Sequence, residues 1–164
     1  MKIQTVMLGV VFFLGVYISS AQLRIAVLPF RNMDGNLALT QWCVKLSDSV
    51  ATSLRLQDTS NKYYVVVPQD SVAEVLASLN INPVNPQYES DMWKAVAMLH
   101  IQRIITGNFN IQYGKMLINA YNYDVQTKLP HPIAQAKNLF KSQDKTLEVV
   151  PSIITKIIPG LIPQ

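Results

Sequence analysis

The sequence predicts an α/β (α+β) domain in which helices pack on a single mixed β-sheet, and three observations predict it. In the first half of the chain, short apolar β-branched segments alternate with amphipathic helical segments, a pattern typical of crossover connections between parallel strands. The second half holds three strand-like segments joined by short turns, which requires antiparallel pairing. A last helical segment closes the chain. The expected order is therefore β-α-β-α-α-β-β-β-α.

The first strand is expected at 23–30, an apolar segment with β-branched members and a proline near its end. A loop that contains Asn, Asp and Gly follows at 31–36. From 37 to 56, apolar residues recur at spacings of three and four with charged residues between them, which predicts an amphipathic helix. Asn36 is suited to cap this helix because its side chain can accept a hydrogen bond from the first turn.

A second strand is expected at 63–67, where five consecutive apolar residues indicate a strand covered on both faces. Two shorter helices follow this strand. One begins near Asp70 and reaches Leu79, and the other spans 91–100 with Ser90 as its cap. A proline-containing loop separates the two helices.

The second half of the chain predicts two hairpins and a terminal helix. Strands are expected at 103–111, 115–125 and about 132–139, with polar and glycine-containing turns between them. The stretch 142–158 carries apolar residues at helical spacing. Pro151 interrupts this stretch, so we expect the helix to kink or to restart there.

The first 21 residues have the layout of a cleavable signal peptide. Lys2 precedes an apolar run at 6–18, and small residues follow at 19–21; these are the three regions that export and cleavage require. Cleavage before Gln22 is expected. The alternative is an uncleaved membrane anchor, but the run is shorter than the ~18–20 apolar residues that span a bilayer.

The signal peptide predicts an exported protein, located in the periplasm or secreted. No cysteine lies near the cleavage site to carry a lipid, so a bacterial lipoprotein is not expected. Removing 21 of the 164 residues leaves 143, which is the size of one ordinary domain. The expected boundaries are a signal peptide at 1–21 and a single domain at 22–164, with an apolar C-terminal helical region at 142–161.

The charges argue against a nucleic-acid-binding protein. The formal net charge of the full chain is +4, and its lysines and arginines are scattered without a run of like charges. Nucleic-acid binding requires basic residues gathered on one face. We therefore expect no nucleic acid among the partners.

The residues that could carry catalysis or bind metal do not form a motif. Cys43 is the only cysteine and falls on the apolar stripe of its predicted helix, which indicates a buried thiol. His100 and His131 are the only histidines and lie 31 positions apart. We expect no catalytic, cofactor-binding or metal-binding residues and no cofactor, and the chain is not predicted to be an enzyme. The alternative is a ligand-binding protein or hydrolase with a site assembled from distant residues.

Several segments in register resemble one family. The apolar strand that ends in Pro-Phe and is followed by Asn32 resembles the first strand of the TolB amino-terminal-like domains, a group related to the CsgG, FlgO and penicillin-binding-protein-activator proteins of the bacterial envelope. Four later segments continue the match, at 46–54, 64–68, 104–109 and 115–127. The resemblance implies a fold of this type, a location in the Gram-negative cell envelope, and a domain that acts by binding other proteins without catalytic residues.

The terminal segment is unusually apolar and is a candidate interaction surface. Between 149 and 161 its only charge is Lys156, whereas a helix with one buried face ordinarily carries more polar residues opposite. Exposure to a partner or membrane and burial on both sides within the fold are the two alternatives. The candidate surface comprises Val150, Ile153, Ile154, Ile157, Ile158 and Leu161.

A second group of candidate contact residues is aromatic: Trp93, Tyr113, Tyr121 and Tyr123. Packing within the fold is the alternative for these side chains. Together, the observations predict a non-enzymatic exported envelope protein that binds other envelope proteins, as a homo-oligomer or as a subunit of a secretion or surface-assembly complex. The further alternative is a peripheral membrane protein that uses the C-terminal helix without being integral to the membrane.

Overall fold

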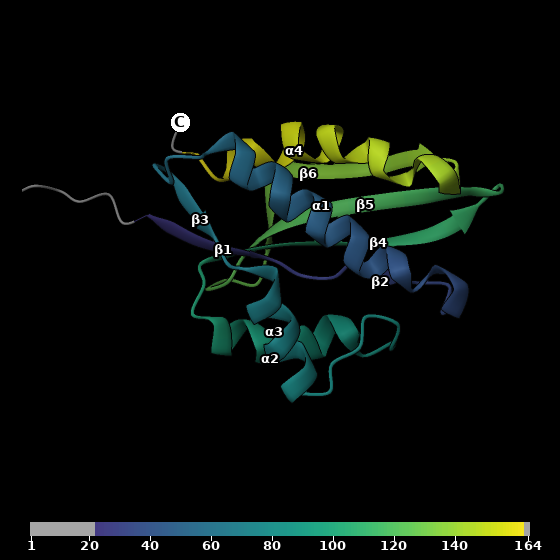
Figure 1. Cartoon of the computed structure of the whole chain (residues 1–164), viewed down its shortest axis with the longest axis horizontal. Helices are drawn as coiled ribbons and strands as arrows, with labels where there is room; N and C mark the ends of the chain where they lie inside the picture. The colour runs from purple at the N-terminus through teal and green to yellow at the C-terminus, as the bar shows by residue number, and fades with distance from the viewer. Residues whose placement is uncertain (1–21, 163–164) are drawn as a thin grey trace, which may run out of the picture.

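A single mixed sheet forms the centre of the protein (Figure 1). The computed structural model describes residues 22–162, and the signal peptide predicted at 1–21 lies outside them. The strand order is β3-β1-β4-β5-β6, and the short β2 pairs with β4 beside this path. The strands are β1 (Leu23–Val27), β2 (Arg31–Asn32), β3 (Tyr64–Val66), β4 (Arg103–Gln112), β5 (Lys115–Asp124) and β6 (Pro130–Lys141).

The sheet divides into a parallel and an antiparallel half at β4. β1 pairs in parallel with β3 on one side and with β4 on the other. β4, β5 and β6 then follow one another as antiparallel hairpins. Crossover helices connect the parallel strands, whereas short turns connect the antiparallel ones, so the connection lengths determine both pairings.

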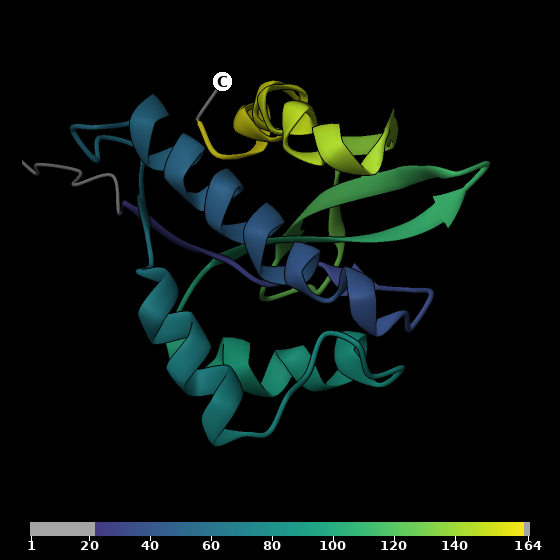
Figure 2. The same cartoon turned by 45° about the vertical axis from the view of Figure 1, so that its right-hand side comes forward.

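Helices cover the two faces of the sheet in pairs (Figures 1 and 2). α1 (Gln41–Gln57) and α4 (Val150–Ile157) lie side by side on one face, and α2 (Gln69–Ser78) and α3 (Tyr88–Leu99) lie on the other. Three short 3-10 helices complete the chain: η1 (Leu37–Leu39), η2 (Gln143–Val149) and η3 (Ile158–Gly160). Each face of the sheet therefore has its own hydrophobic core.

The two cores meet at the central strands, whose side chains alternate between them. Ile25 and Val27 of β1 point into the core beneath α1 and α4, while Ala26 points into the core beneath α2 and α3. All three are fully buried. This alternation explains the consecutive apolar residues from Ile25 to Val27, because a segment covered on both faces needs apolar residues at every position.

The predicted fold class and element order are confirmed, with three local corrections. Residues 31–36 are not wholly a loop, because Arg31 and Asn32 form β2 and pair in parallel with Asn108 and Phe109 of β4. The Asn36 side chain caps η1, where it accepts from the backbone N–H of Ala38, rather than capping the long helix. A 3-10 turn thus intervenes before α1, and the sequence pattern cannot separate it from the helix because both carry apolar residues at similar spacing.

The third correction concerns the start of α3. This helix begins at Tyr88, so Ser90 lies within it instead of capping it. The Ser90 hydroxyl donates to the carbonyl of Gln87, 2.7 Å away. Tyr88 is fully buried, and its hydroxyl donates to the carbonyl of Pro29 at 2.7 Å. This buried contact extends the helix beyond the start that its sequence pattern indicates.

The break predicted at Pro151 is confirmed. η2 ends at Val149, and α4 begins at Val150 with the proline in its first turn. A proline at this position costs no hydrogen bond, because the first N–H groups of a helix have no partner within it. The chain therefore restarts as a new helix that lies against α1 and the sheet.

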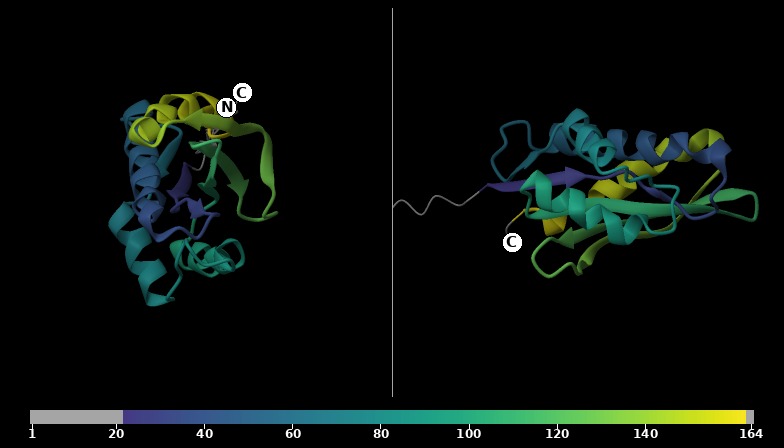
Figure 3. Two further views of the ribbon diagram at one scale, coloured as in Figure 1. Left: turned by 90° about the vertical axis from the view of Figure 1, so that its right-hand side faces the viewer. Right: turned by 90° about the horizontal axis from the view of Figure 1, so that it is seen from below.

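The antiparallel half keeps one face largely free of helices. α4 packs on β5 and β6 from one side, and α2 and α3 lie on the opposite side of the sheet (Figure 3, left). α2 packs on β1, and α3 lines a small crevice with β4 and β5. Trp93 of α3 reaches across to Tyr123 of β5. The side chains on this free face of β5 are partly exposed instead of buried.

Candidate functional site

The apolar surface predicted on the C-terminal helix lies inside the protein. Within this set the structure buries five residues and half-buries the sixth, Ile158. Of the two alternatives that the sequence left open, the structure favours burial of this apolar set within the fold, while the opposite side of α4 is exposed. The buried residues are Val150, Ile153, Ile154, Ile157 and Leu161.

Two neighbours explain this burial. α4 packs against both α1 and the hairpin strands, so the side of the helix that faces these two neighbours needs apolar residues. The exposed remainder consists of Pro151, Ser152, Thr155 and Lys156. Ile154 and Ile158 also line an open hollow of about 440 Å³ between α1 and α4.

The aromatic residues, in contrast, gather on the free face of the antiparallel half. Trp93 and Tyr123 meet edge to face with their ring centroids 6.0 Å apart. Tyr121 lies two residues from Tyr123 on the same face of β5, at a centroid distance of 5.9 Å. Such pairs keep aromatic side chains in defined positions near the surface. Tyr113 does not belong to this group, because it lies in the β4–β5 turn and is 97% exposed.

Two lysines lie over these rings. The Nζ of Lys128 is 5.5 Å from the centre of the Trp93 ring, and the Nζ of Lys137 is 5.7 Å from that of Tyr121. Among the described residues neither lysine forms an ion pair. We call Trp93, Tyr121, Tyr123, Lys128 and Lys137 the aromatic face. Its chemistry combines flat apolar contact area with positive charge, which suits contact with a protein surface.

Amide groups continue this face along the hairpin. The Asn119 side-chain amide donates to Oδ1 of Asn108 across the strands at 2.9 Å. Oδ1 of Asn119 accepts from the backbone N–H of Asn138 at 2.9 Å, where β6 carries a bulge. Leu117 and Phe140 pair further along the same face, and Phe140 is 43% exposed. The free face is therefore a mixed polar and aromatic surface.

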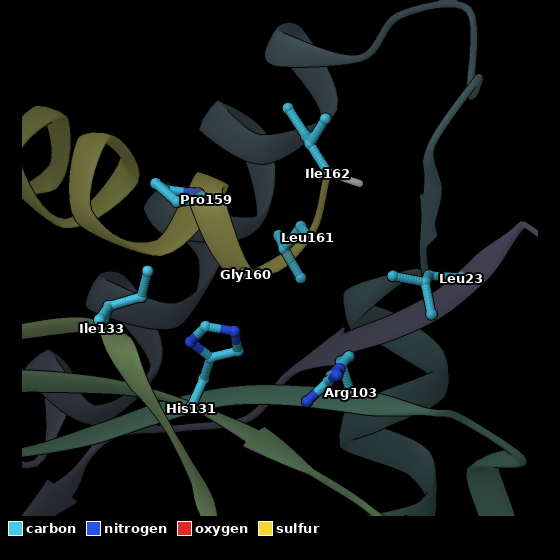
Figure 4. A pocket seen from close by; sticks show the side chains of 8 residues that line it. All are labelled: Leu23, Arg103, His131, Ile133, Pro159, Gly160, Leu161 and Ile162. Carbon is cyan, nitrogen blue, oxygen red and sulfur yellow. The ribbon is translucent and has the colours of Figure 1, made fainter. Parts of the chain in front are cut away.

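A pocket lies on the side of the hairpin opposite the aromatic face, where the C-terminal tail (159–162) crosses the sheet (Figure 4). Its volume is about 480 Å³, within the ~300–1,000 Å³ typical of small-molecule sites. It lies at the end of the sheet where β1, β4 and β6 begin. We call it the tail pocket. Its lining consists of Leu23, Arg103, His131, Ile133, Pro159, Gly160, Leu161 and Ile162.

Two polar side chains, those of Arg103 and His131, line this pocket from the strands below the tail (Figure 4). Arg103 begins β4, and its guanidinium lies 3.2 Å from the carboxylate of Asp124. Hydrogen bonds from Thr127 in the following turn, and then the charge of Arg103, hold the pKa of Asp124 below its usual range. His131 lies at the start of β6, and its ring points at the segment that contains Gly160.

An irregularity of β6 holds His131 in place. The register between β5 and β6 shifts between Tyr121 and Tyr123, where several residues of β6 bulge outward. Within the bulge, Nδ1 of His131 accepts from the backbone N–H of Ala134 at 3.2 Å, and the Gln135 side chain donates to the His131 carbonyl at 2.7 Å. In the neutral ring the proton therefore lies on Nε2. Bulges of this kind redirect a side chain from the sheet toward a site.

Gly160 allows the tail to lie directly on the sheet. A Cβ at this position would lie 2.5 Å from Nδ2 of Asn122 and 2.6 Å from the Cβ of Ala134. Asn122 is fully buried, and neither polar atom of its side chain has a hydrogen-bond partner among the described residues. An unpaired buried amide of this kind costs free energy of folding.

The residues considered for catalysis are not brought together. Cys43 is fully buried in α1, and burial raises the pKa of its thiol to about 11, so it is a poor nucleophile. His100 ends α3 in a left-handed conformation and does not line the tail pocket. Between residues 22 and 162 no group of three His, Cys, Asp or Glu side chains could hold a metal ion. No helix in this part of the chain has the length and apolarity to cross a membrane.

The tail pocket was not predicted from the sequence. Its polar lining residues, Arg103 and His131, come from two strands that only the sheet brings together. One local signal existed, because Pro130 and Pro132 flank His131 and prolines within a strand mark an edge or a bulge. That signal indicates the irregular strand but not the pocket beneath it.

Comparison with known proteins identifies relatives of the fold. No protein-family model matches the sequence, and no curated protein resembles it significantly. The structure resembles the LpoB C-terminal domain from Salmonella enterica with a TM-score of 0.51 and 13% identity, over 74% of this chain and 84% of that one. It resembles the NMR structure of E. coli LpoB with a TM-score of 0.50 and 12% identity, over 76% of this chain and 60% of that one. At these identities the likeness shows the fold alone.

TolB from Acinetobacter baumannii is a more distant match. Its TM-score is 0.41 at 21% identity, and the match covers 85% of this chain and 29% of that one. The likeness to the LpoB C-terminal domain, at a TM-score of 0.51, is what shows the fold of the described residues. The relationship to CsgG and FlgO proteins stays a prediction from the sequence.

Proposed function

We propose that the protein is a non-enzymatic, exported module of the cell envelope that binds another protein through the aromatic face. The fold shared with the LpoB C-terminal domain and the resemblance of the sequence to TolB amino-terminal-like domains support this class of function. The observation that carries the proposal is the free face of β5, where Tyr121 and Tyr123 stand partly exposed.

The charge of the aromatic face indicates the kind of partner. Lys128 and Lys137 lie over aromatic rings and have no carboxylate partner among the described residues. A partner segment with acidic and apolar side chains would pair with these lysines and cover the rings. The proposed partner is therefore an envelope protein that presents an acidic surface segment.

Burial weakens the alternative of membrane attachment through the C-terminal helix. An interfacial helix binds lipid through an exposed apolar face, whereas Ile153 and Ile157 of α4 are fully buried. The proposed function includes two more specific forms. The partner can be a second copy of this chain, or a subunit of a secretion or surface-assembly complex.

Crosslinking in cells tests the proposal. A tagged full-length protein is crosslinked in the envelope, and the proteins that co-purify are identified and quantified by mass spectrometry. We expect a partner of defined ratio whose recovery falls at least tenfold in the double variant Tyr121→Ala, Tyr123→Ala. Tyr113→Ala is the matched control, because it removes an equally large but separate exposed tyrosine.

Circular dichroism must show that the double variant keeps its fold. Equal recovery of the same partner with the double variant and with the control would contradict the proposal. Loss of the partner with Tyr113→Ala alone would also contradict it, because the contact would then lie at the β4–β5 turn.

A further inference from the structure

We propose that the tail pocket is a binding site for a carboxylate carried on an apolar group. This site lies on the side of β5 opposite the aromatic face, since Asn122 alternates with Tyr121 and Tyr123 along the strand. The inference goes beyond the proposed function, and the two can fail separately.

The lining of the tail pocket favours an amphipathic ligand. Most of its side chains are apolar, and the two polar ones, Arg103 and His131, come from β4 and β6. Binding sites for small molecules have this composition, in which apolar walls supply area and a few polar groups orient the ligand. The apolar walls are Leu23, Ile133, Pro159, Leu161 and Ile162.

The polar groups of the site are mainly hydrogen-bond donors. Arg103 carries five N–H donors, and its only ion pair in the described residues is the single contact with Asp124 at 3.2 Å. His131 uses Nδ1 as an acceptor within the bulge, which leaves Nε2–H as a donor. An acceptor with negative charge, such as a carboxylate, satisfies both groups.

The buried amide of Asn122 lies beneath the tail, next to this site. The point where a Gly160 Cβ would lie is 2.5 Å from Nδ2 of Asn122 and 3.3 Å from Cδ2 of His131, so the amide adjoins the imidazole behind the tail. Its two polar atoms have no partner among the described residues. Both atoms are closed off from solvent beneath Gly160, so the ligand contacts Arg103 and His131 and not this amide.

The ligand could come from two sources with the same chemistry. One is the C-terminal carboxylate of a peptide whose last residues are apolar, and the other is a free amphipathic acid. Both present a carboxylate to Arg103 and His131 and an apolar chain to the walls. Carboxylate capture is a known mode of peptide recognition.

Three probes separate these sources and test the site. They are octanoate, an acetylated peptide that ends in two leucines with a free carboxylate, and the same peptide with a C-terminal amide. Binding to the protein as purified from cells is measured by calorimetry and by NMR chemical shifts. We expect at least one acid to bind at least tenfold more tightly than the peptide amide, with shifts at Arg103 and His131. The tighter acid identifies the source.

Two variants and one matched control complete the experiment. Arg103→Met removes the guanidinium. Ile133→Asp adds a carboxylate that repels the acid, at a wall residue that is exposed and lies outside the hydrophobic core. Each variant should weaken binding of the acid at least tenfold. Lys141→Met also breaks a strand ion pair, with Glu148, but lies outside the pocket lining and should leave affinity within twofold. Equal binding of acid and amide, no binding by either acid, or unchanged affinity in Ile133→Asp would overturn the proposal.

Discussion

The parallel and antiparallel halves of the sheet differ in how their faces are covered. β1 has apolar cores on both faces from Ile25 to Val27, so these three residues are buried. β5 has a core on one face only, and its side chains alternate between buried and partly exposed. A strand that is covered on both faces needs apolar residues at every position. Residues that contact a partner can therefore lie only on a strand with one uncovered face, such as β5. Both proposed sites accordingly involve the hairpin strands.

The largest effect is expected at Gly107, where the two halves meet on β4. A Cβ there would collide with the backbone carbonyl of Asn119 and lie 2.6 Å from the ring of Phe30. Gly107→Val should therefore lower the free energy of unfolding by more than about 3 kcal/mol, as overpacking against a backbone atom does at its upper range. Urea unfolding followed by circular dichroism measures this change.

Gly114→Ala is the control for this prediction. Gly114 lies in the β4–β5 turn with a φ of +73° and nothing within 4 Å of an added Cβ, so only backbone strain opposes the substitution. A cost of about 1 kcal/mol is expected. A larger loss at Gly114 than at Gly107 would show that the turn, and not the junction on β4, limits stability.

The second effect concerns α4, the helix that the sequence offered as an interaction surface. Ile153→Ala should cost about 2–5 kcal/mol, because the side chain is fully buried and its removal leaves a cavity. Ile133→Ala on β6, where the side chain is 63% exposed, should cost less than about 0.5 kcal/mol. Thermal unfolding of the two variants compares them, and a near-zero cost at Ile153 would contradict the packing of α4.

The third prediction compares one carboxylate from each half. Asp58 links α1 to β3; burial opposes its charge, but N–H groups of Tyr63, Lys62 and Tyr64 hold its pKa below the usual range. Asp58→Asn should cost about 1–3 kcal/mol at neutral pH. Asp124 is more exposed, and its pKa is also lowered. Asp124→Asn should therefore lower the free energy of unfolding by less than Asp58→Asn does.

The pH dependence of this loss follows from the direction of the shift. Around its titration, a carboxylate with a lowered pKa binds fewer protons in the folded state than in the unfolded state. Its contribution to the free energy of unfolding is therefore fully present above the unfolded pKa of about 3.9. That contribution disappears as the pH falls through the folded pKa. Urea unfolding at several pH values should show the difference between wild type and Asp58→Asn shrinking below pH ~4. A difference that grows on acidification would contradict the lowered pKa.

The smallest effect is expected from Lys137 on the aromatic face. Lys137→Met removes a charge 5.7 Å from the ring of Tyr121 but keeps most of the aliphatic stem. An exposed cation–π contact contributes about 0.5–1 kcal/mol, so the loss in thermal stability should not exceed this range. Partner recovery by crosslinking should nevertheless fall, and a variant that keeps its partner would restrict the contact to the tyrosines.

Sequence patterns predicted the elements well wherever local signals were strong. The apolar segment at 63–67 and the turns of the hairpins matched β3 and the β4–β5–β6 meander. The predictions failed where a distant contact decided the outcome. Pairing with β4 converted Arg31 and Asn32 into a strand, and neither residue has a local preference that indicates this.

The sequence by itself determined the element order, the mixed sheet and the burial of Cys43, because apolar spacing and connection length are local properties of the chain. It did not determine which apolar surface is free. α4 is buried because α1 and the hairpin enclose it, whereas Tyr121 and Tyr123 are partly exposed because α2 and α3 cover the other half of the sheet. The tail pocket likewise exists only after Gly160 brings the tail onto Asn122. Exposure depends on what packs against a segment, and tertiary structure alone decides that.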